Sequence, residues 1–399
     1  MPTPPPDDVL RPHDPTPEEI ESPAELHDHL RAGSLAGLTV QGLRLDVDPP
    51  DLSTVDVTDT LFVGCRFASS DVAAALVARG AVVVPDFPAL PYPTQPPHLY
   101  TAEDLAAGFD VGGFAGMYDA VVYDHFRASG GALPAIREAL AQRLHDHAID
   151  NALYDATRAW LATHGPESVV GVMGGHAVPR GSAPYRLAAT LGWELARADQ
   201  LVVTGGGPGV MEAANLGAYL ATRSADDLTA AVDALAVAPD FLEHDRYTAA
   251  ALSVRGRFAP APSAADDPAA WARRGGLAIP TWLYGHEPAN LFAGQIAKYF
   301  SNAIREDMIL RLARGGIVFA AGRAGTVQEV FQAATKTFYG TDGASGAYVF
   351  LDKAFWTETL PIEALLRPLM ALSPFGDLSK AIHVTDDVRS AVQVLTRST

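Results

Sequence analysis

The chain has 399 residues, of which 48% are hydrophobic and 19% charged, so it is long enough for two domains with sizeable cores. The formal net charge of −18 argues against broad binding to nucleic acid or anionic membranes, which need a basic face. Cys65 is the only cysteine, which excludes an internal disulfide and a cysteine-based metal site. We therefore expect no metal, no cofactor, no nucleic acid and no membrane partner.

Residues 1–22 are rich in proline and acidic residues and lack both a basic segment and an apolar core. This composition is typical of a disordered leader and not of a secretion signal. No uninterrupted apolar run in the chain reaches the length of a membrane span. The sequence thus predicts a cytoplasmic protein.

Residues 23–160 are predicted to form a smaller N-terminal α+β domain, whose role the sequence does not indicate. Short alternating runs between 35 and 67, broken by Gly, Pro and Asp, indicate small strands, and 69–85 reads as a helix followed by a strand. Apolar residues at helical spacing predict one long helix over 134–164.

Residues 161–399 alternate between strands and helices. Strand patterns begin near 168, 200, 276, 316, 346 and 381, and most are followed by a helical pattern, including a long helix expected over 290–315. Residues 223–275 fit no clear pattern. Regular alternation at this spacing predicts an α/β fold, a Rossmann-like parallel sheet with helices on both faces.

Two glycine loops carry the chemistry in this region. "TGGGPGVMEAAN" (204–215) and "AGRAGTVQEVF" (321–331) each leave a buried strand and enter a helix. Glycines allow close approach of a ligand, and a helix start offers free N–H groups to phosphate. Such a turn can also be purely structural, but two in one domain favour a nucleotide or sugar-phosphate site. Neither loop is a Walker A motif or a well-registered GxGxxG, which lowers the weight of an ATPase or a dehydrogenase.

The residues from about 165 to 390 resemble the LOG ("Lonely Guy") family, whose signatures are a GGG loop before a helix and a later PGGxGTxxE. "MGGHAV" (173–178) is similar to the first-strand loop of the larger bacterial nucleotide 5′-monophosphate nucleosidases. The resemblance implies hydrolysis of the N-glycosidic bond of nucleoside 5′-monophosphates by a homodimer or higher homo-oligomer. It implies ligand contacts from Gly174, Gly175, His176, Gly206, Gly207, Gly209, Val210, Met211, Glu306, Gly322, Arg323, Ala324, Gly325 and Thr326.

The same resemblance implies catalytic roles for Arg305 and Glu329. Glu329 is one helical turn beyond the second loop, where a carboxylate could stabilise positive charge at C1′ or activate water. It could instead only complement the helix dipole, and Arg305 could be an ordinary surface residue of its helix. His176 and Arg180, in the first-strand loop, are ligand candidates, although a packed loop histidine is an equally ordinary role.

Arg323 stands where the family loop has its second glycine. If the backbone there had a positive φ, Arg would cost on the order of 1 kcal/mol. A bidentate contact with phosphate could recover this cost, so we interpret Arg323 as a modified phosphate clamp. The departure also keeps a second hypothesis open, a non-catalytic nucleotide sensor on a LOG-like fold.

Apolar residues of the predicted 290–315 helix suggest a surface through which two copies could associate. On this basis the sequence favours at least a dimer.

Overall fold

The structure is a computed structural model, which describes residues 19–87, 89–259, 267–341 and 346–396. The chain forms two compact units. The smaller takes its described residues from Pro12–Leu99 and His125–Tyr154, and the larger from Tyr100–Asp124 and Asp155–Thr399. The sequence predicts a single boundary near residue 160, whereas the structure groups residues 100–124 with the larger unit.

The smaller unit is built on parallel strands in the order β1-β2-β4-β3, with β5 also paired to β4. Its register aligns Ile20 with Val40 and Val40 with Phe62, so equivalent strand residues recur at roughly 20-residue intervals. All three side chains are fully buried in the core of this unit. The elements are β1 (Glu19–Ile20), α1 (Pro23–Ala32), β2 (Thr39–Gln41), β3 (Arg44–Leu45), β4 (Leu61–Phe67), α2 (Ser70–Ala78) and β5 (Val82–Pro85).

The described residues include the end of the predicted leader. Residues 19–22 were assigned to the leader, but Ile20 lies in β1, and the Ser22 side chain accepts a hydrogen bond from the backbone N–H of Glu25 to cap α1. The rest of the proposed leader lies outside the described residues. The long helix was predicted correctly and is α6 (Ile136–His164).

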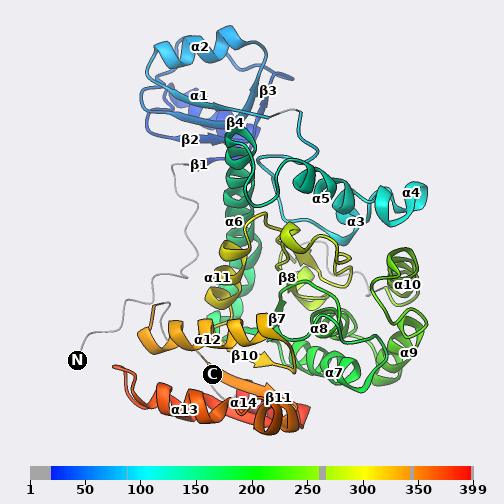
Figure 1. The fold of residues 1–399 in the computed structure, drawn as a ribbon. Helices are drawn as coiled ribbons and strands as arrows, with labels where there is room; N and C mark the ends of the chain where they lie inside the picture. The colour runs from blue at the N-terminus through cyan, green and yellow to red at the C-terminus, as the bar shows by residue number, and fades with distance from the viewer. Residues whose placement is uncertain (1–18, 88, 260–266, 342–345, 397–399) are drawn as a thin grey trace. The chain divides into compact units, whose positions relative to one another are not determined.

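The larger unit contains a seven-stranded, wholly parallel sheet in the order β12-β11-β10-β6-β7-β8-β9, and Figure 1 shows its strands among helices. The predicted Rossmann-like α/β fold is therefore confirmed. The strands are β6 (Val169–Met173), β7 (Leu201–Thr204), β8 (Leu277–Ala278), β9 (Gln295–Ile296), β10 (Gly316–Phe319), β11 (Ala347–Leu351) and β12 (Ile382–Thr385).

Strand order reverses between β6 and β10. From β6 the chain adds β7, β8 and β9 toward one edge, then returns to place β10 beside β6 and adds β11 and β12 toward the other. In open parallel sheets a crevice opens at such a reversal, outside the carboxyl ends of the strands. The fold therefore predicts a ligand site between the loops that follow β6 and β10.

Helices precede, connect and follow these strands. They are α3 (Ala102–Ala106), α4 (Phe109–Gly116), α5 (Tyr118–Ala128), α7 (Ala183–Arg197), α8 (Val210–Tyr219), α9 (Ala225–Leu235), α10 (His244–Arg257), α11 (Asn302–Leu312), α12 (Ala324–Tyr339), α13 (Glu363–Ala371) and α14 (Val388–Thr396). The unassigned segment 223–275 supplies α9 and α10, and its residues 260–266 lie outside the described part of the chain.

The helix predicted over 290–315 was wrong in its first half. Only 302–312 is helical, as α11, while 295–296 form strand β9. A Cβ at Gly294 would lie 2.2 Å from the Trp271 carbonyl oxygen, so this segment runs against a neighbouring backbone. A run of apolar residues buried on every side gives no periodicity by which to tell a helix from a strand.

This correction removes the surface on which the dimer prediction depended. Seven of the eight side chains expected to form it are buried, namely Leu291, Phe292, Ile296, Tyr299, Phe300, Met308 and Ile309, and the eighth, Ile304, is half-buried. Assembly into a homodimer therefore stays a prediction from family resemblance alone.

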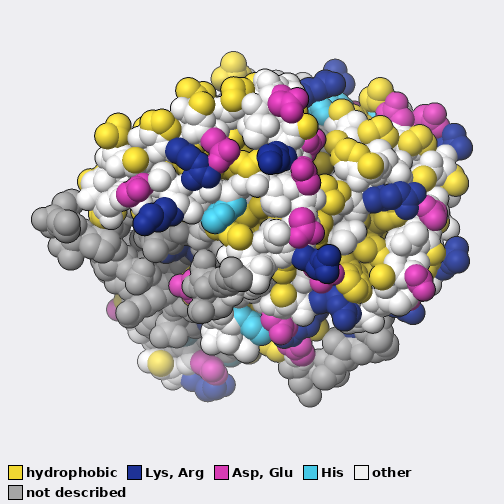
Figure 2. Space-filling view, turned by 90° about the horizontal axis from the view of Figure 1, so that it is seen from below, with side chains coloured by type: hydrophobic (Ala, Val, Ile, Leu, Met, Phe, Trp, Pro, Cys, Tyr) yellow, Lys and Arg dark blue, Asp and Glu magenta, His cyan; other side chains and the backbone are white. Residues whose placement is uncertain are grey.

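The described surface carries charged side chains of both signs. On the face seen in Figure 2, basic and acidic side chains are interspersed among apolar ones. Within the described ranges, no helix is both long and apolar enough to cross a membrane.

Candidate functional site

A cavity of about 630 Å³ lies at the carboxyl ends of β6, β7 and β10. Its walls are the loop after β6 (174–178), the first glycine loop (205–207), the segment 280–289 and the second glycine loop with the start of α12 (321–329). Residues of α11, including Arg305, complete it. The volume is within the range usual for small-molecule sites, and the position is the one that the strand reversal predicts.

Backbone hydrogen bonds join the three loops. The N–H of Gly175 donates to the Ala321 carbonyl at 3.1 Å, and the N–H of Val210 donates to the Gly175 carbonyl at 3.2 Å. Gly209 has φ +70°, and a Cβ there would lie 2.4 Å from the Gly175 oxygen. Glycine is thus required at 209 both for its backbone conformation and for this close approach.

Buried polar side chains fix the first glycine loop. Thr204 Oγ1 donates to Asn215 Oδ1 at 2.6 Å and accepts from the N–H of Gly206 at 3.1 Å. The Asn215 amide also donates to the Gly275 carbonyl at 2.6 Å and accepts from Asn290 at 2.8 Å. Asn215, the last residue of the "GGGPGVMEAAN" motif, therefore holds the loop and does not contact the cavity.

The second glycine loop ends at Arg323, the N-cap residue of α12. Its backbone is extended, with φ −113° and ψ −158°, so Arg at this position is unstrained and the positive φ considered above is excluded. The side chain is exposed and lines the cavity. Thr326 is buried against Gly322, where a Cβ would lie 2.2 Å from Thr326 Oγ1. Position 322 therefore has room only for glycine, whereas position 323 accommodates an arginine.

Arg305 and Glu329 meet at the cavity wall from α11 and α12. Arg305 Nη1 lies 3.6 Å from Glu329 Oε1, an ion pair too long for a hydrogen bond. Among the described residues, neither Nε nor Nη1 of Arg305 has a hydrogen-bond partner, although the side chain is 91% buried. Buried guanidinium N–H groups are costly when unpaired, so this site is suited to an anionic or hydroxyl-bearing ligand.

Burial raises the pKa of Glu329 to about 7, because the cavity wall desolvates its charged form. The positive charge of Arg305 works against this rise, and the neighbouring Glu306 adds to it. A carboxyl group with such a pKa exchanges protons near neutral pH, which is the property that acid–base catalysis needs.

Two side chains hold the Glu306 carboxylate in place. Its carboxylate accepts a hydrogen bond from Asn302 at 2.7 Å and from Gln328 at 3.0 Å. Lys336 of α12 also lies 2.8 Å from Asp307 of α11. The contacts of Gln328 with Glu306 and of Lys336 with Asp307 join α12 to α11, the two helices that carry Glu329 and Arg305.

The structure brings most of the sequence-predicted site residues together. The cavity is lined by Gly174, Gly175, His176, Gly206, Gly207, Met211, Arg305, Glu306, Gly322, Arg323, Gly325, Thr326 and Glu329. Gly209, Val210 and Ala324 do not line it. Val210 instead packs under Gly174, where a Cβ would lie 2.7 Å from Val210 Cγ1.

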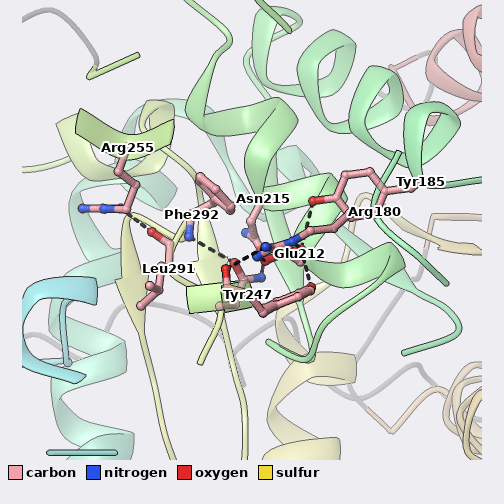
Figure 3. A network of polar contacts seen from close by, with 9 residues as sticks. Arg180, Tyr185, Glu212, Asn215, Tyr247, Arg255, Leu291 and Phe292 are labelled. Atoms are coloured by element: carbon pink, nitrogen blue, oxygen red, sulfur yellow. Dashed lines mark hydrogen bonds and ion pairs between the residues drawn. The ribbon is translucent and has the colours of Figure 1, made fainter. Parts of the chain in front are cut away.

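Arg180, a candidate ligand contact in the sequence, is a structural residue. It donates to both carboxylate oxygens of Glu212, at 2.9 and 2.5 Å, and Tyr185 and Tyr247 donate to the same carboxylate at 2.9 and 2.6 Å (Figure 3). The Arg180 guanidinium also covers the Tyr247 ring at 3.1 Å. These contacts satisfy Glu212 and fix the start of α8 below the first glycine loop.

The cavity residues that the sequence did not indicate include His286, Glu287 and Lys298. Glu287 Oε1 lies 2.7 Å from Nδ1 of His176, and His286 precedes it. Lys298 is buried and pairs with Asp119, which also accepts from Trp282 Nε1 at 2.9 Å. The dipeptide His286–Glu287 lies between two assigned elements, and Lys298 fell within the wrongly extended helix. A histidine–acid dipeptide beside a proline was the available signal for a functional loop.

Metal ligation has no support in the described ranges, where no group of three or more His, Cys, Asp or Glu side chains could hold an ion.

A family model matches part of the chain. The model of the SLOG cluster4 family matches residues 167–224, which cover β6, α7, β7, the first glycine loop and α8. The SLOG superfamily includes LOG-like proteins, so the match supports a nucleotide-related fold for this segment. No curated protein matches the chain.

The Glu212 cluster generates a stability prediction. Glu212→Ala leaves Arg180 buried without its partner, and we expect the free energy of unfolding in urea to fall by about 3–5 kcal/mol. The matched control is Asp233→Ala, which breaks the exposed Arg186–Asp233 pair and should cost about 0–1 kcal/mol. Equal effects of the two substitutions would contradict the structural role of Glu212.

Glu329 generates a second stability prediction. Its pKa is higher in the folded protein, about 7, than in the unfolded chain, so its contribution to stability is complete at acid pH and is lost as pH rises through 7. Glu329→Gln removes the buried charge and should raise the free energy of unfolding above pH 8 by on the order of 3 kcal/mol. The gain should vanish below pH 4.5. A gain independent of pH would contradict the raised pKa.

Proposed function

We propose that this protein hydrolyses the N-glycosidic bond of nucleoside 5′-monophosphates, releasing the free base and ribose 5-phosphate. The observation that carries the proposal is the Arg305–Glu329 pair, a buried cation with unpaired N–H groups beside a carboxyl that titrates near neutrality. The match to the SLOG cluster4 family and the resemblance of both glycine loops to the LOG family support the same chemistry.

The substrate phosphate is assigned to the start of α12. There, the free N–H groups of the first helical turn, the exposed Arg323 and the Thr326 hydroxyl border the cavity. Helix N-termini favour phosphate, and an arginine adds charge-assisted hydrogen bonds. Glu329 is in the next turn of the same helix, so a phosphate held at the helix start brings the ribose toward Glu329 and Arg305.

Glu329 in its carboxylate form serves the reaction at C1′. Breaking the glycosidic bond develops oxocarbenium character on the ribose, which a nearby carboxylate stabilises. The same group accepts the proton of the attacking water. Arg305 favours the ionised form of Glu329 and, through Nε and Nη1, donates to ribose hydroxyls or phosphate oxygens. Desolvation by the cavity strengthens each of these interactions.

Chromatography of reaction mixtures tests the proposal. The wild type is incubated separately with AMP, GMP, CMP, UMP and IMP, and free base is measured against the Glu329→Gln variant, which keeps the shape of the side chain and removes its charge. We expect base release by the wild type with at least one nucleotide and none by the variant. Tight binding without any base release would reject the hydrolase and favour a nucleotide sensor.

The pKa of Glu329 predicts the pH dependence of the reaction. Below pH 7 the protonated carboxyl cannot accept a proton from water, so kcat/KM should rise with pH as Glu329 ionises around pH 7. The substrate phosphate titrates at slightly lower pH, and Glu329→Asp separates the two groups. A rising limb that stays at the same pH in the Asp variant belongs to the substrate and contradicts the role of Glu329.

Arg323 generates a binding prediction. Arg323→Gly and Arg323→Gln both remove charge-assisted hydrogen bonds, each worth roughly 1.5–3 kcal/mol. Calorimetry with the substrate nucleotide, in the Glu329→Gln background, should show affinity lowered at least tenfold and less sensitive to salt. Because the backbone at 323 is extended, glycine relieves no strain here. Unchanged affinity in both variants would mean that Arg323 points to solvent and does not clamp phosphate.

A further inference from the structure

A second pair of titratable side chains lines the same cavity. His176 comes from the loop after β6, and Glu287 from the segment after the 3-10 turn Trp282–Tyr284. Nδ1 of His176 lies 2.7 Å from Glu287 Oε1. The Glu287 side chain is 11% exposed and that of His176 is 46% exposed. In this pair the Glu287 carboxylate is buried, and the His176 ring is accessible to a ligand in the cavity.

Glu287 is held in place from two directions. Its N–H donates to the Tyr284 carbonyl at 2.9 Å, and its Oε2 would lie 3.0 Å from a Cβ at Gly207. The glycine at 207 thus admits the carboxylate into the wall of the cavity. Burial raises the pKa of Glu287, while the positive charges of His176, His286 and Arg305 oppose the rise.

The contact with Glu287 orients the histidine ring. Since Nδ1 faces the carboxylate, Nε2 is the nitrogen that can carry a proton to a ligand. The Phe241 ring lies 6.0 Å from the His176 ring, centroid to centroid. A carboxylate at Nδ1 fixes the ring orientation and leaves Nε2 to face a ligand.

We propose that His176, oriented by Glu287, is the general acid that protonates the departing base. This inference rests on the proposed hydrolysis. As the C1′–N bond breaks, its electron pair stays on the base, and the Nε2 proton passes to a ring nitrogen or carbonyl oxygen of that base. Water forms the new C1′–O bond and gives a proton to the Glu329 carboxylate. The products are neutral base and ribose 5-phosphate, and solvent returns the proton from Glu329 to His176.

The two pairs come from opposite sides of the strand reversal. His176 follows β6, whereas Glu329 lies on the helix that follows β10. Glycosidic hydrolysis needs one group that gives a proton to the leaving group and another that serves the sugar carbon. Pairs whose surroundings differ are the usual source of such a division of roles. Glu287 is then a positioning residue, and His176 the catalytic acid.

Substrates with different leaving groups test this assignment. A purine or pyrimidine leaves poorly without a proton, whereas para-nitrophenolate leaves as a stable anion. Wild type and His176→Gln are therefore compared on the best nucleotide of the base-release assay and on para-nitrophenyl ribofuranoside 5′-phosphate. We expect His176→Gln to lower kcat for the nucleotide about 10²- to 10⁴-fold and to change kcat for the nitrophenyl substrate by less than about threefold.

Glu287→Gln should show the same selective loss in weaker form, since it keeps the side chain but not its charge. His383→Gln, on strand β12 outside the cavity, is the matched control and should leave kcat for both substrates unchanged. Melting temperatures of all variants identify any that fail to fold.

Three results would overturn the assignment. Equal loss on both substrates in His176→Gln means that the residue does not act on the leaving group. Selective loss in His286→Gln but not in His176→Gln transfers the acid to His286. If neither the wild type nor any variant hydrolyses the nucleotide or the nitrophenyl substrate, the proposed function is rejected, and this inference with it.

Discussion

The unsatisfied cation at Arg305 is the constraint around which the site is arranged. Its guanidinium is buried, two of its nitrogens, Nε and Nη1, have no hydrogen-bond partner among the described residues, and the Glu329 carboxylate lies 3.6 Å from Nη1. Both groups cost stability in the empty protein, since burial also raises the pKa of Glu329 to about 7. A fold keeps such a cost where it serves a ligand, because the desolvated charges act strongly on whatever enters the cavity.

The sheet supplies the rigid frame for this arrangement. Because strand order reverses between β6 and β10, the loops after these strands lie side by side, and the backbone of Gly175 connects the two glycine loops. Beneath them, the Glu212 cluster and Asn215 use buried hydrogen bonds to fix α8 and its loop. In the first glycine motif, Gly205, Gly206 and Gly207 border the cavity, while Glu212 and Asn215 hold the loop in place.

Much of the fold followed from the sequence, because alternating strands and helices in long periodic segments are strong signals. The same reasoning found the cavity-lining residues Arg305 and Glu329 through their place beside recognisable loops. It failed for the segment 290–301, where apolar residues buried on all sides carry no period, and so it missed Lys298. It also missed Glu287, whose contact with His176 joins segments distant in sequence, and the roughly 20-residue strand interval of the smaller unit.

The most direct test is a crystal structure of the Glu329→Gln variant with an intact nucleotide bound, chosen as one that the wild type hydrolyses. The account predicts the phosphate at the start of α12, within hydrogen-bond distance of Thr326 or Arg323, and Arg305 donating to the ligand through the N–H groups that now lack partners. It also predicts C1′ within about 4 Å of the residue 329 side chain, as a near-attack arrangement requires, and the base beside His176. A nucleotide bound with its phosphate at the His176–Glu287 pair, or with C1′ remote from residue 329, would contradict it.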